Sequence, residues 1–383
     1  MVDNSKLFET IKLNNNVEVP GRLAVAPLSI YGSDDSGQIT DEERSYLAHR
    51  ATGIGLYILG AVSVNIEGIG IKGQPRAISE KDIPSLAERA KIVKDQGALA
   101  INQINHAGLY GNKSNSGKSP LSPSASVSNK ELEKMGMLND DDTKNEELTN
   151  DDILRIINDF ANATELSIKA GYDGIEIHAA NNFLIQQFYS GYYNKRTDEW
   201  GGSLEKRMRF PLEVVDACCK IRDKYNKPEF IIWYRLSPEE PFEDGITMTE
   251  TLALVRALVQ KPIQYIHVSL KNYFQNARRG EGAGTPRLKL IHDEIKGKVA
   301  LIGVGGLLSE KDINKALNTG FTEFIAVGRA IMINKNLGKL LKEGKGDQLE
   351  LEVDKEHPEK YSFPKALWNM CLQGFDWLPK IKK

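Results

Sequence analysis

A histidine and an asparagine follow an apolar segment near the middle of the chain. Residues 173–178 are predicted to form a strand that ends at His178, and Asn181 comes three residues later. In a parallel α/β barrel the carboxyl ends of the strands surround the active site, so polar residues at a strand end are candidates for chemistry. We therefore expect His178 and Asn181 to be catalytic.

The ends of other predicted strands carry further polar residues, namely Gln103, Arg235 and the pair Gly328 and Arg329. The combined set holds an imidazole, two carboxamides and guanidinium groups. A metal-dependent hydrolase would need several Asp, Glu or His ligands in one place. The sequence therefore predicts no metal centre, and it favours a site for a large polar ring and a phosphate.

Glycines at the ends of the last two predicted strands indicate where a phosphate would bind. Gly305 and Gly306 end the seventh strand, and Gly328 with Arg329 ends the eighth. Barrels build phosphate sites there from backbone amides, which glycine leaves accessible, and arginine adds a bidentate contact. Glycines at strand ends also simply make turns, so the interpretation depends on the coincidence of both pairs.

A regular alternation of strand and helix patterns positions these residues. Eight short segments rich in Val, Ile, Leu and Tyr are predicted as buried strands, and helical periodicity lies between them. Eight βα units in order are typical of a closed (β/α)8 barrel, whereas a doubly wound sheet has fewer strands and a reversal of strand order. The predicted strands are 22–26, 55–59, 98–104, 173–178, 230–236, 265–269, 299–303 and 323–327, and the predicted helices lie near 41–52, 83–96, 151–170, 204–225, 249–260, 286–296, 309–318 and 336–343.

Side chains alternate between the inside and the outside of a barrel. An orientation that brings His178 to the mouth also points Glu176 inward and sends Ile175 and Ile177 toward the helices. On the sixth strand, His267 is predicted to be an interior barrel residue.

Four helix starts carry the sequence of a capping box, in which a hydroxyl and a carboxylate satisfy free backbone amides reciprocally. These pairs support the predicted boundaries. They are Thr40 with Glu43, Thr149 with Asp152, Thr247 with Glu250, and Ser309 with Asp312.

We divide the chain into a barrel at 1–343 and a C-terminal extension at 344–383. Residues 107–148 form a long excursion after the third strand, and we expect it to cover substrate because loops at that position lie over the mouth. The extension is acidic and then aromatic, and it is expected to pack on the barrel or on a partner subunit.

Charge and composition exclude several classes of partner. The 383 residues carry 50 basic and 52 acidic side chains, interspersed, so neither nucleic acid nor an anionic membrane is an expected partner. No apolar segment approaches the ~20 residues of a membrane span, and the polar start is unlike a signal peptide, so a cytoplasmic location is expected. The cysteines, Cys218, Cys219 and Cys371, are predicted to be packing residues. The sequence leaves open whether the chain forms a homo-oligomer.

Five runs of the chain match a family pattern, and the longest, which begins at Asn194 with the sequence Asn-Lys-Arg-Thr-Asp, is specific. The runs are 26–31, 103–108, 174–181, 194–207 and 328–329. Together they resemble the old yellow enzyme family of FMN-dependent NAD(P)H:flavin oxidoreductases, and the resemblance covers about residues 7–345.

The resemblance implies non-covalently bound FMN across the barrel mouth, with NADH or NADPH as reductant. Gln103 would bond the pyrimidine edge, and Arg235 would stabilise the reduced flavin near N1 and O2. His178 and Asn181 would donate hydrogen bonds to a substrate carbonyl, which prepares a conjugated alkene for hydride attack at its β-carbon. The other implied FMN contacts are Ala26, Pro27, Leu28, Ser29 and Ala61 at the ring, and Gly305, Gly306, Gly328 and Arg329 at the phosphate.

The chain departs from the family pattern at Phe183, where many relatives carry the tyrosine that protonates the alkene. A phenyl ring cannot donate a proton, so water, Tyr31, Tyr110 or Tyr273 is left as the donor. Both Tyr31 and Phe183 are expected to border the substrate. Ser29 replaces the Cys or Thr of relatives, and we expect it to alter the flavin potential and to retain binding.

The sequence therefore predicts an enzyme that passes hydride from NADH or NADPH to an activated alkene, a quinone or a similar small-molecule acceptor. Two alternatives stay open. One is an FMN-dependent oxidase or dehydrogenase of another small molecule. The other is a flavin-binding protein with weak turnover, which would not need the proton donor that Phe183 replaces.

Overall fold

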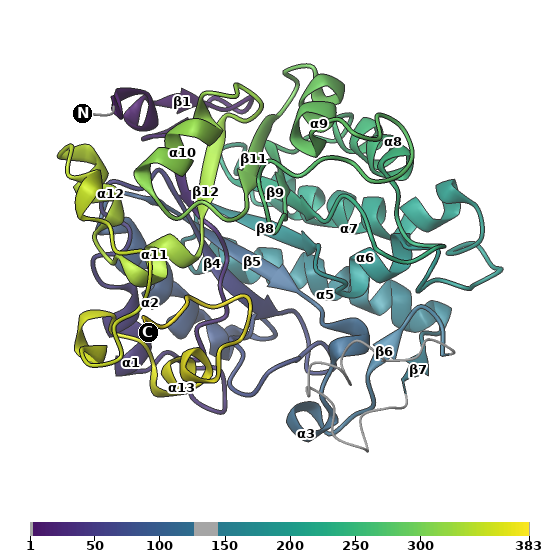
Figure 1. Ribbon diagram of the computed structural model, residues 1–383. Coiled ribbons are helices and arrows are strands. Elements are labelled where there is room, and N and C mark those ends of the chain that lie inside the picture. Colours follow the sequence, from purple (N-terminus) through teal and green to yellow (C-terminus); the bar gives the residue numbers. More distant parts are fainter. Residues whose placement is uncertain (1–2, 126–144, 383) are drawn as a thin grey trace.

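The chain forms a closed barrel of eight parallel strands with helices around it (Figure 1). The structure is a computed structural model that describes residues 3–125 and 145–382. Neighbouring strands follow in the order β10-β11-β12-β3-β4-β5-β8-β9, which confirms the predicted (β/α)8 fold. The barrel strands are β3 (Leu23–Val25), β4 (Leu56–Ser63), β5 (Leu99–Asn105), β8 (Gly174–Ala179), β9 (Ile231–Leu236), β10 (Tyr265–Val268), β11 (Ala300–Val304) and β12 (Phe324–Val327).

The helices lie outside the barrel. Those predicted end within two residues of their expected bounds, except that α1 ends at Leu47, five residues before its predicted end. Within the described residues, no helix is long and apolar enough to cross a lipid bilayer. The predicted helices are α1 (Asp41–Leu47), α2 (Ile83–Lys94), α5 (Asn150–Lys169), α7 (Leu204–Lys224), α8 (Met248–Leu258), α9 (Arg287–Ile295), α10 (Glu310–Leu317) and α12 (Leu337–Lys342), and the additional ones are α3 (Lys113–Ser116), α6 (Leu184–Tyr189), α11 (Arg329–Ile333) and α13 (Lys365–Gln373).

Capping boxes are present at the starts of α5, α8 and α10, as predicted. At α1 only one of the two hydrogen bonds of the predicted capping box is present. The Thr40 hydroxyl accepts the backbone N–H of Glu43, but the Glu43 carboxylate binds the buried guanidinium of Arg89 and the hydroxyl of Ser33. A charged, bidentate donor is a stronger partner for a carboxylate than one backbone amide, and it draws Glu43 away from the helix start.

The strands bury both of their faces. Ile175 and Ile177 pack in the hydrophobic layer between the sheet and the helices, whereas Trp233 and Tyr265 pack inside the barrel. From inside the barrel, Glu176 on β8 bonds to side chains on β5 and β10. The predicted alternation along β8 is therefore confirmed.

A short N-terminal hairpin covers the amino ends of the barrel strands. It consists of β1 (Ile11–Lys12) and β2 (Glu18–Val19), and Asn14 between them donates to the carbonyls of Ile263 and Lys298 just before β10 and β11. Apolar residues of this hairpin join the interior cluster of the barrel. Strands of two residues are too short for a periodic pattern, so sequence analysis did not find the hairpin.

The two segments outside the barrel repeat differ in how they attach. The ends of the excursion form β6 (Leu121–Ser122) and β7 (Glu146–Glu147), which pair with each other, and its residues 126–144 lie outside the described residues. The C-terminal extension is joined to the barrel by the buried Arg50, which donates to the carbonyls of Tyr361 and Met332. Helix α13 places Leu367 and Cys371 in the main hydrophobic cluster.

Candidate active site

At the end of β8, His178 is held as a neutral hydrogen-bond donor. The ring is 3% exposed, and its Nδ1 accepts the backbone N–H of Ala180 at 3.3 Å, so the proton lies on Nε2. Burial, followed by the positive charge of Arg235, holds the pKa of His178 well below its usual range. The imidazole therefore offers one N–H at neutral pH and carries no charge.

The carboxamide of Asn181 is oriented so that its amide nitrogen can donate. Its backbone adopts a left-handed conformation with φ of 57°, and its N–H donates to the Ser237 hydroxyl at 2.9 Å. Its Oδ1 accepts the hydroxyl of Ser269 at 3.0 Å. Because the oxygen is engaged, the exposed Asn181 has Nδ2 left to donate to a ligand.

Behind these donors lies the cationic Arg235. The side chain is 6% exposed, and its Nη2 donates to Ser269 at 3.1 Å. Its Nε is buried and has no recorded partner within the described residues. Strand register places Arg235 directly beside His178 on β8 and His267 on β10. The structure thus brings His178, Asn181 and Arg235 together, as predicted from strand ends.

Two serines that sequence analysis missed connect this group. Ser237 directly follows β9, and Ser269 directly follows β10, and both hydrogen-bond Asn181. Serine is common in loops, so its presence after a strand carries no signal of its own. The one available signal was position, because each residue lies at the end of a predicted strand or directly after it.

One layer deeper, Gln103 and His267 both bond the buried carboxylate of Glu176. The Gln103 Nε2 donates to Oε1 at 2.6 Å, and the His267 Nδ1 lies 2.7 Å from Oε2. The prediction that His267 is an interior residue is confirmed, since the side chain is fully buried. With its nitrogen engaged, Gln103 keeps Oε1 as an acceptor.

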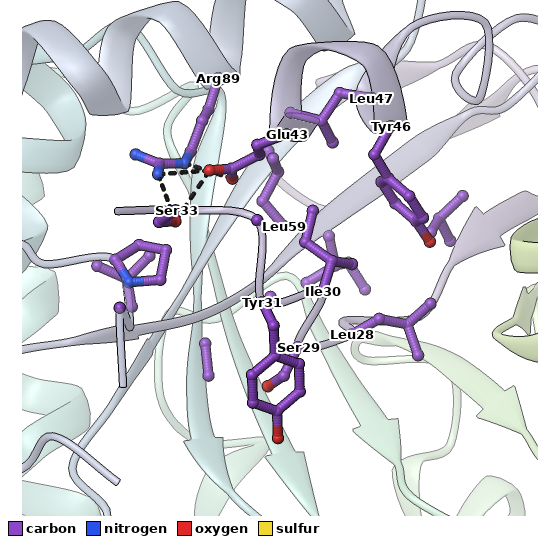
Figure 2. A pocket seen from close by; sticks show the side chains of 18 of the residues that line it. Leu28, Ser29, Ile30, Tyr31, Ser33, Glu43, Tyr46, Leu47, Leu59 and Arg89 are labelled. Atoms are coloured by element: carbon purple, nitrogen blue, oxygen red, sulfur yellow. Dashed lines mark hydrogen bonds and ion pairs between the residues drawn. The ribbon is translucent and has the colours of Figure 1, made fainter. Parts of the chain in front are cut away.

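The segment after β3 forms one wall of the candidate site. Ala26 is buried, and Pro27, Leu28, Ser29 and Tyr31 are half-buried. Figure 2 shows Tyr31 pointing away from the cluster of Ser33, Glu43 and Arg89, which is joined by hydrogen bonds of 2.7 to 2.9 Å. That cluster lies on the far side of the segment and anchors it.

The wall segment presses closely on β4. A β-carbon on Gly60 would lie 1.9 Å from the carbonyl oxygen of Leu28, so only glycine allows this approach. The β4 register also shifts between Leu59 and Val62, around the candidate residue Ala61. A cavity with about 610 Å3 of free space, including space open to solvent, is lined by Leu28, Ser29 and Ala61 in front and by α1 side chains behind.

The ends of β11 and β12 have the features expected of an anion site. Gly305 and Gly306 have φ of 143° and 68°, and a β-carbon on Gly305 would lie 2.7 Å from the backbone nitrogen of Tyr273. A β-carbon on Gly328 would meet only the Leu28 side chain, at 3.7 Å. Arg329 is half-buried, and among the described residues no acidic partner is recorded for it.

A pair of aromatic rings extends from His178. Phe183 meets it edge to face with ring centroids 4.7 Å apart, and Tyr110 meets Phe183 in the same way at 5.8 Å. The Tyr273 hydroxyl instead bonds Ala316 and Thr322 outside the barrel. Of the three tyrosines considered as proton donors, Tyr110 is thus linked to His178 through Phe183, and Tyr273 is turned away.

The most specific sequence run, 194–207, has a structural role. Asn194 donates to the carbonyls of Phe188 and Trp200, and Arg196 binds Asp198 and the carbonyl of Leu148. These contacts join the loop before α7 to the end of the excursion. The run identifies the architecture and supplies no side chain recorded at the mouth.

The cysteines and possible metal ligands are the remaining candidates for special chemistry. The three cysteines are buried and free, which confirms that they are packing residues. Within residues 3–125 and 145–382 no group of three or more His, Cys, Asp or Glu side chains is placed to hold a metal ion.

Comparisons with known proteins relate the whole chain to one family of flavin enzymes. The profile of the NADH:flavin oxidoreductase / NADH oxidase family matches residues 6–348. The "Probable NADH-dependent flavin oxidoreductase YqiG" of Bacillus subtilis is 37% identical over 97% of both chains. The NADH:fumarate oxidoreductase of Klebsiella pneumoniae is 32% identical over 97% of this chain, and the NADH:acrylate oxidoreductase of Vibrio harveyi is 33% identical over 86%. This chain spans only 39% and 32% of the length of those two proteins.

Solved structures share the fold. An old yellow enzyme homologue from Zymomonas mobilis superposes with a TM-score of 0.75 and 25% identity, over 94% of this chain and 99% of the other. Morphinone reductase in complex with tetrahydroNAD gives a TM-score of 0.74 at 24% identity, over 94% and 96% of the two chains.

A third histidine close to the site predicts how stability depends on pH. His106 is 1% exposed, its Nδ1 accepts the N–H of Gly108 at 3.0 Å, and burial lowers its pKa to about 3. Below pH ~6.5 the unfolded chain binds a proton there that the folded chain does not, so stability falls as the pH falls. We expect His106→Gln to reduce the slope of unfolding free energy against pH, between pH 6 and 4, by about 1.4 kcal/mol per pH unit.

Urea unfolding at several pH values measures this slope. His357→Gln, which removes an exposed histidine in place of a buried one, is measured alongside as the comparison variant. Equal slopes for wild type and His106→Gln would show that His106 takes up its proton in the folded state.

Proposed function

The chain belongs to the NADH:flavin oxidoreductase / NADH oxidase family, and we propose that it reduces a small acceptor whose oxygen is held by His178 and Asn181. The expected acceptors are activated alkenes, conjugated to a carbonyl or carboxylate, and quinones. The observation that carries this proposal is the pair of donors at the end of β8, both left with an N–H available for a ligand oxygen.

The residues at the mouth fit the FMN that the family uses. Arg235 has a buried Nε without a recorded partner among the described residues, and Gln103 has a free Oε1. These two groups suit the N1/O2 and N3–H positions of a flavin pyrimidine. The glycines after β11 and β12 and the half-buried Arg329 suit its phosphate.

The remaining implied FMN contacts are the wall residues Ala26, Pro27, Leu28, Ser29 and Ala61. When bound, FMN supplies two-electron hydride chemistry, with NADH as the reductant. The chain itself supplies position and charge. The anchored wall segment shapes the ring site, and Arg235 provides the positive charge that favours a negatively charged ring.

His178 and Asn181 act on the acceptor. Two N–H groups directed at one oxygen stabilise the negative charge that develops there during reduction, and each such donor contributes ~2–4 kcal/mol in comparable sites. Because His178 is neutral, it contributes a hydrogen bond without adding a second charge beside Arg235. Phe183 packs against the ring of His178 and limits its rotation.

The class of acceptor is inferred from two observations. Relatives that contain this region are named for fumarate and acrylate, both conjugated alkenes bearing a carboxyl group. Phe183, however, removes the hydroxyl of the usual proton donor, and quinones or oxygen would be reduced without one. The second candidate function is therefore an NADH-dependent oxidase, whose acceptor is oxygen.

Anaerobic titration tests the proposed function. NADH added to the FMN-loaded protein should bleach the flavin absorbance, and an enone or acrylate should restore it. We expect His178→Ala to slow the second step about 100-fold or more and to leave bleaching by NADH within a few-fold of wild type. Recovery in air but not with any alkene or quinone would favour the oxidase, and no bleaching would contradict the proposal.

The proton needed for alkene reduction is expected to come from Tyr110, which packs edge to face with Phe183, as His178 does. Tyr110→Phe should slow enone reduction about 100-fold, because a general acid is lost, while quinone reduction stays the same, since its protons go to exchangeable oxygens. Stopped-flow reoxidation with each acceptor measures both rates.

Two other tyrosines calibrate this result. Tyr273→Phe is the matched control and should change neither rate, because its hydroxyl bonds Thr322 outside the barrel. If Tyr31→Phe and not Tyr110→Phe slows enone reduction, Tyr31 is the donor, and the assignment to Tyr110 is wrong.

A further inference from the structure

The barrel interior beneath the candidate site contains a carboxylate to which the proposed reaction gives no role. Glu176 is fully buried, two residues before His178 on the same strand and on the same inward face. An isolated charge at such a place is costly, so its partners need an explanation.

Both oxygens of Glu176 are engaged. Oε1 accepts the amide of Gln103 at 2.6 Å, and Oε2 lies 2.7 Å from Nδ1 of His267. Strand register places Glu176 between Gln103 on β5 and Trp233 on β9. The carboxylate therefore fixes which end of the Gln103 amide faces upward, because its nitrogen is turned down to Oε1 and its oxygen is left for the mouth.

Glu176 also acts on Arg235. The guanidinium is buried, and its recorded hydrogen bond goes to the neutral Ser269. Burial lowers the pKa of Arg235, and the negative charge of Glu176 opposes this effect by stabilising the protonated guanidinium. His178 and His267 lie beside Arg235 in the strand register, and both are expected to be neutral, since burial lowers the pKa of each. The charge beneath the mouth is thus one cation and one anion.

We propose that Glu176 lowers the reduction potential of the bound flavin by offsetting part of the positive charge of Arg235. The inference rests on the proposed function, since it assumes FMN over this layer. Reduction makes the flavin more negative, so the carboxylate disfavours the reduced form and Arg235 favours it. A lower potential makes the reduced enzyme a stronger donor to its acceptor.

The test is the midpoint potential of Glu176→Gln, measured by equilibration with a reference dye. A glutamine keeps the shape, and it can accept from Gln103 and donate to Nδ1 of His267 after a tautomer shift. With Arg235 no longer opposed, we expect the equilibrium to move at least tenfold toward reduced flavin, which for two electrons is about 30 mV upward.

Charge and geometry are separated by Glu176→Asp, which keeps the anion but shortens the side chain. Its potential should stay close to that of wild type. A matched control is Glu165→Gln, which removes a carboxylate from the outer helix α5, where Glu165 bonds Tyr225, and it should leave the potential unchanged. If Glu176→Gln does not fold, the double variant Glu176→Leu/His267→Leu removes the carboxylate together with the histidine that it binds, and the loss of the negative charge should again raise the potential.

Two outcomes would overturn the inference. One is a potential that is unchanged in Glu176→Gln or in the double variant, and the other is a shift of equal size in Glu176→Asp, which would make the role purely structural. Both are distinct from a failure of the proposed function, in which the wild-type protein would bind no FMN or would not be reduced by NADH.

Discussion

The candidate site depends on one constraint, the strict alternation of side chains along β8. Ile175 and Ile177 pack against the helices, so the period of two along the strand turns Glu176 and His178 toward the barrel axis. This alternation stacks a carboxylate under an imidazole. A shift of one residue in strand register would bury the isoleucines inside and remove both polar groups from the site.

The barrel interior can hold charged side chains because each of them has an opposite charge nearby or a hydrogen bond. Arg235 lies at the level of His178 and Glu176 lies two residues deeper along β8, and the histidines beside them remain uncharged. A neutral His178 leaves the arginine as the positive charge next to the proposed flavin ring. The same site can therefore bind an anionic ring and still present N–H groups, not charges, to the acceptor.

Strand ends and their parity could be predicted from the sequence, because apolar alternation and capping residues are local signals. Contacts between distant segments could not. Glu43 looked like a capping residue but binds Arg89, and Ser237 and Ser269 support Asn181 although serine after a strand carries no signal of its own. The run starting at Asn194 indicated the family correctly, yet its side chains brace a loop.

Titration of the FMN-loaded protein with a p-substituted phenol tests the central claim, that His178 and Asn181 hold an oxygen above the flavin ring, most directly. Phenolate stacked on oxidised flavin produces a long-wavelength charge-transfer band, and the two N–H groups should stabilise the phenolate oxygen. The account predicts such a band in the wild-type protein and at least tenfold weaker phenol binding in His178→Ala, as one charge-assisted hydrogen bond of ~1.5–3 kcal/mol is lost. A band of unchanged intensity and affinity in His178→Ala would contradict it.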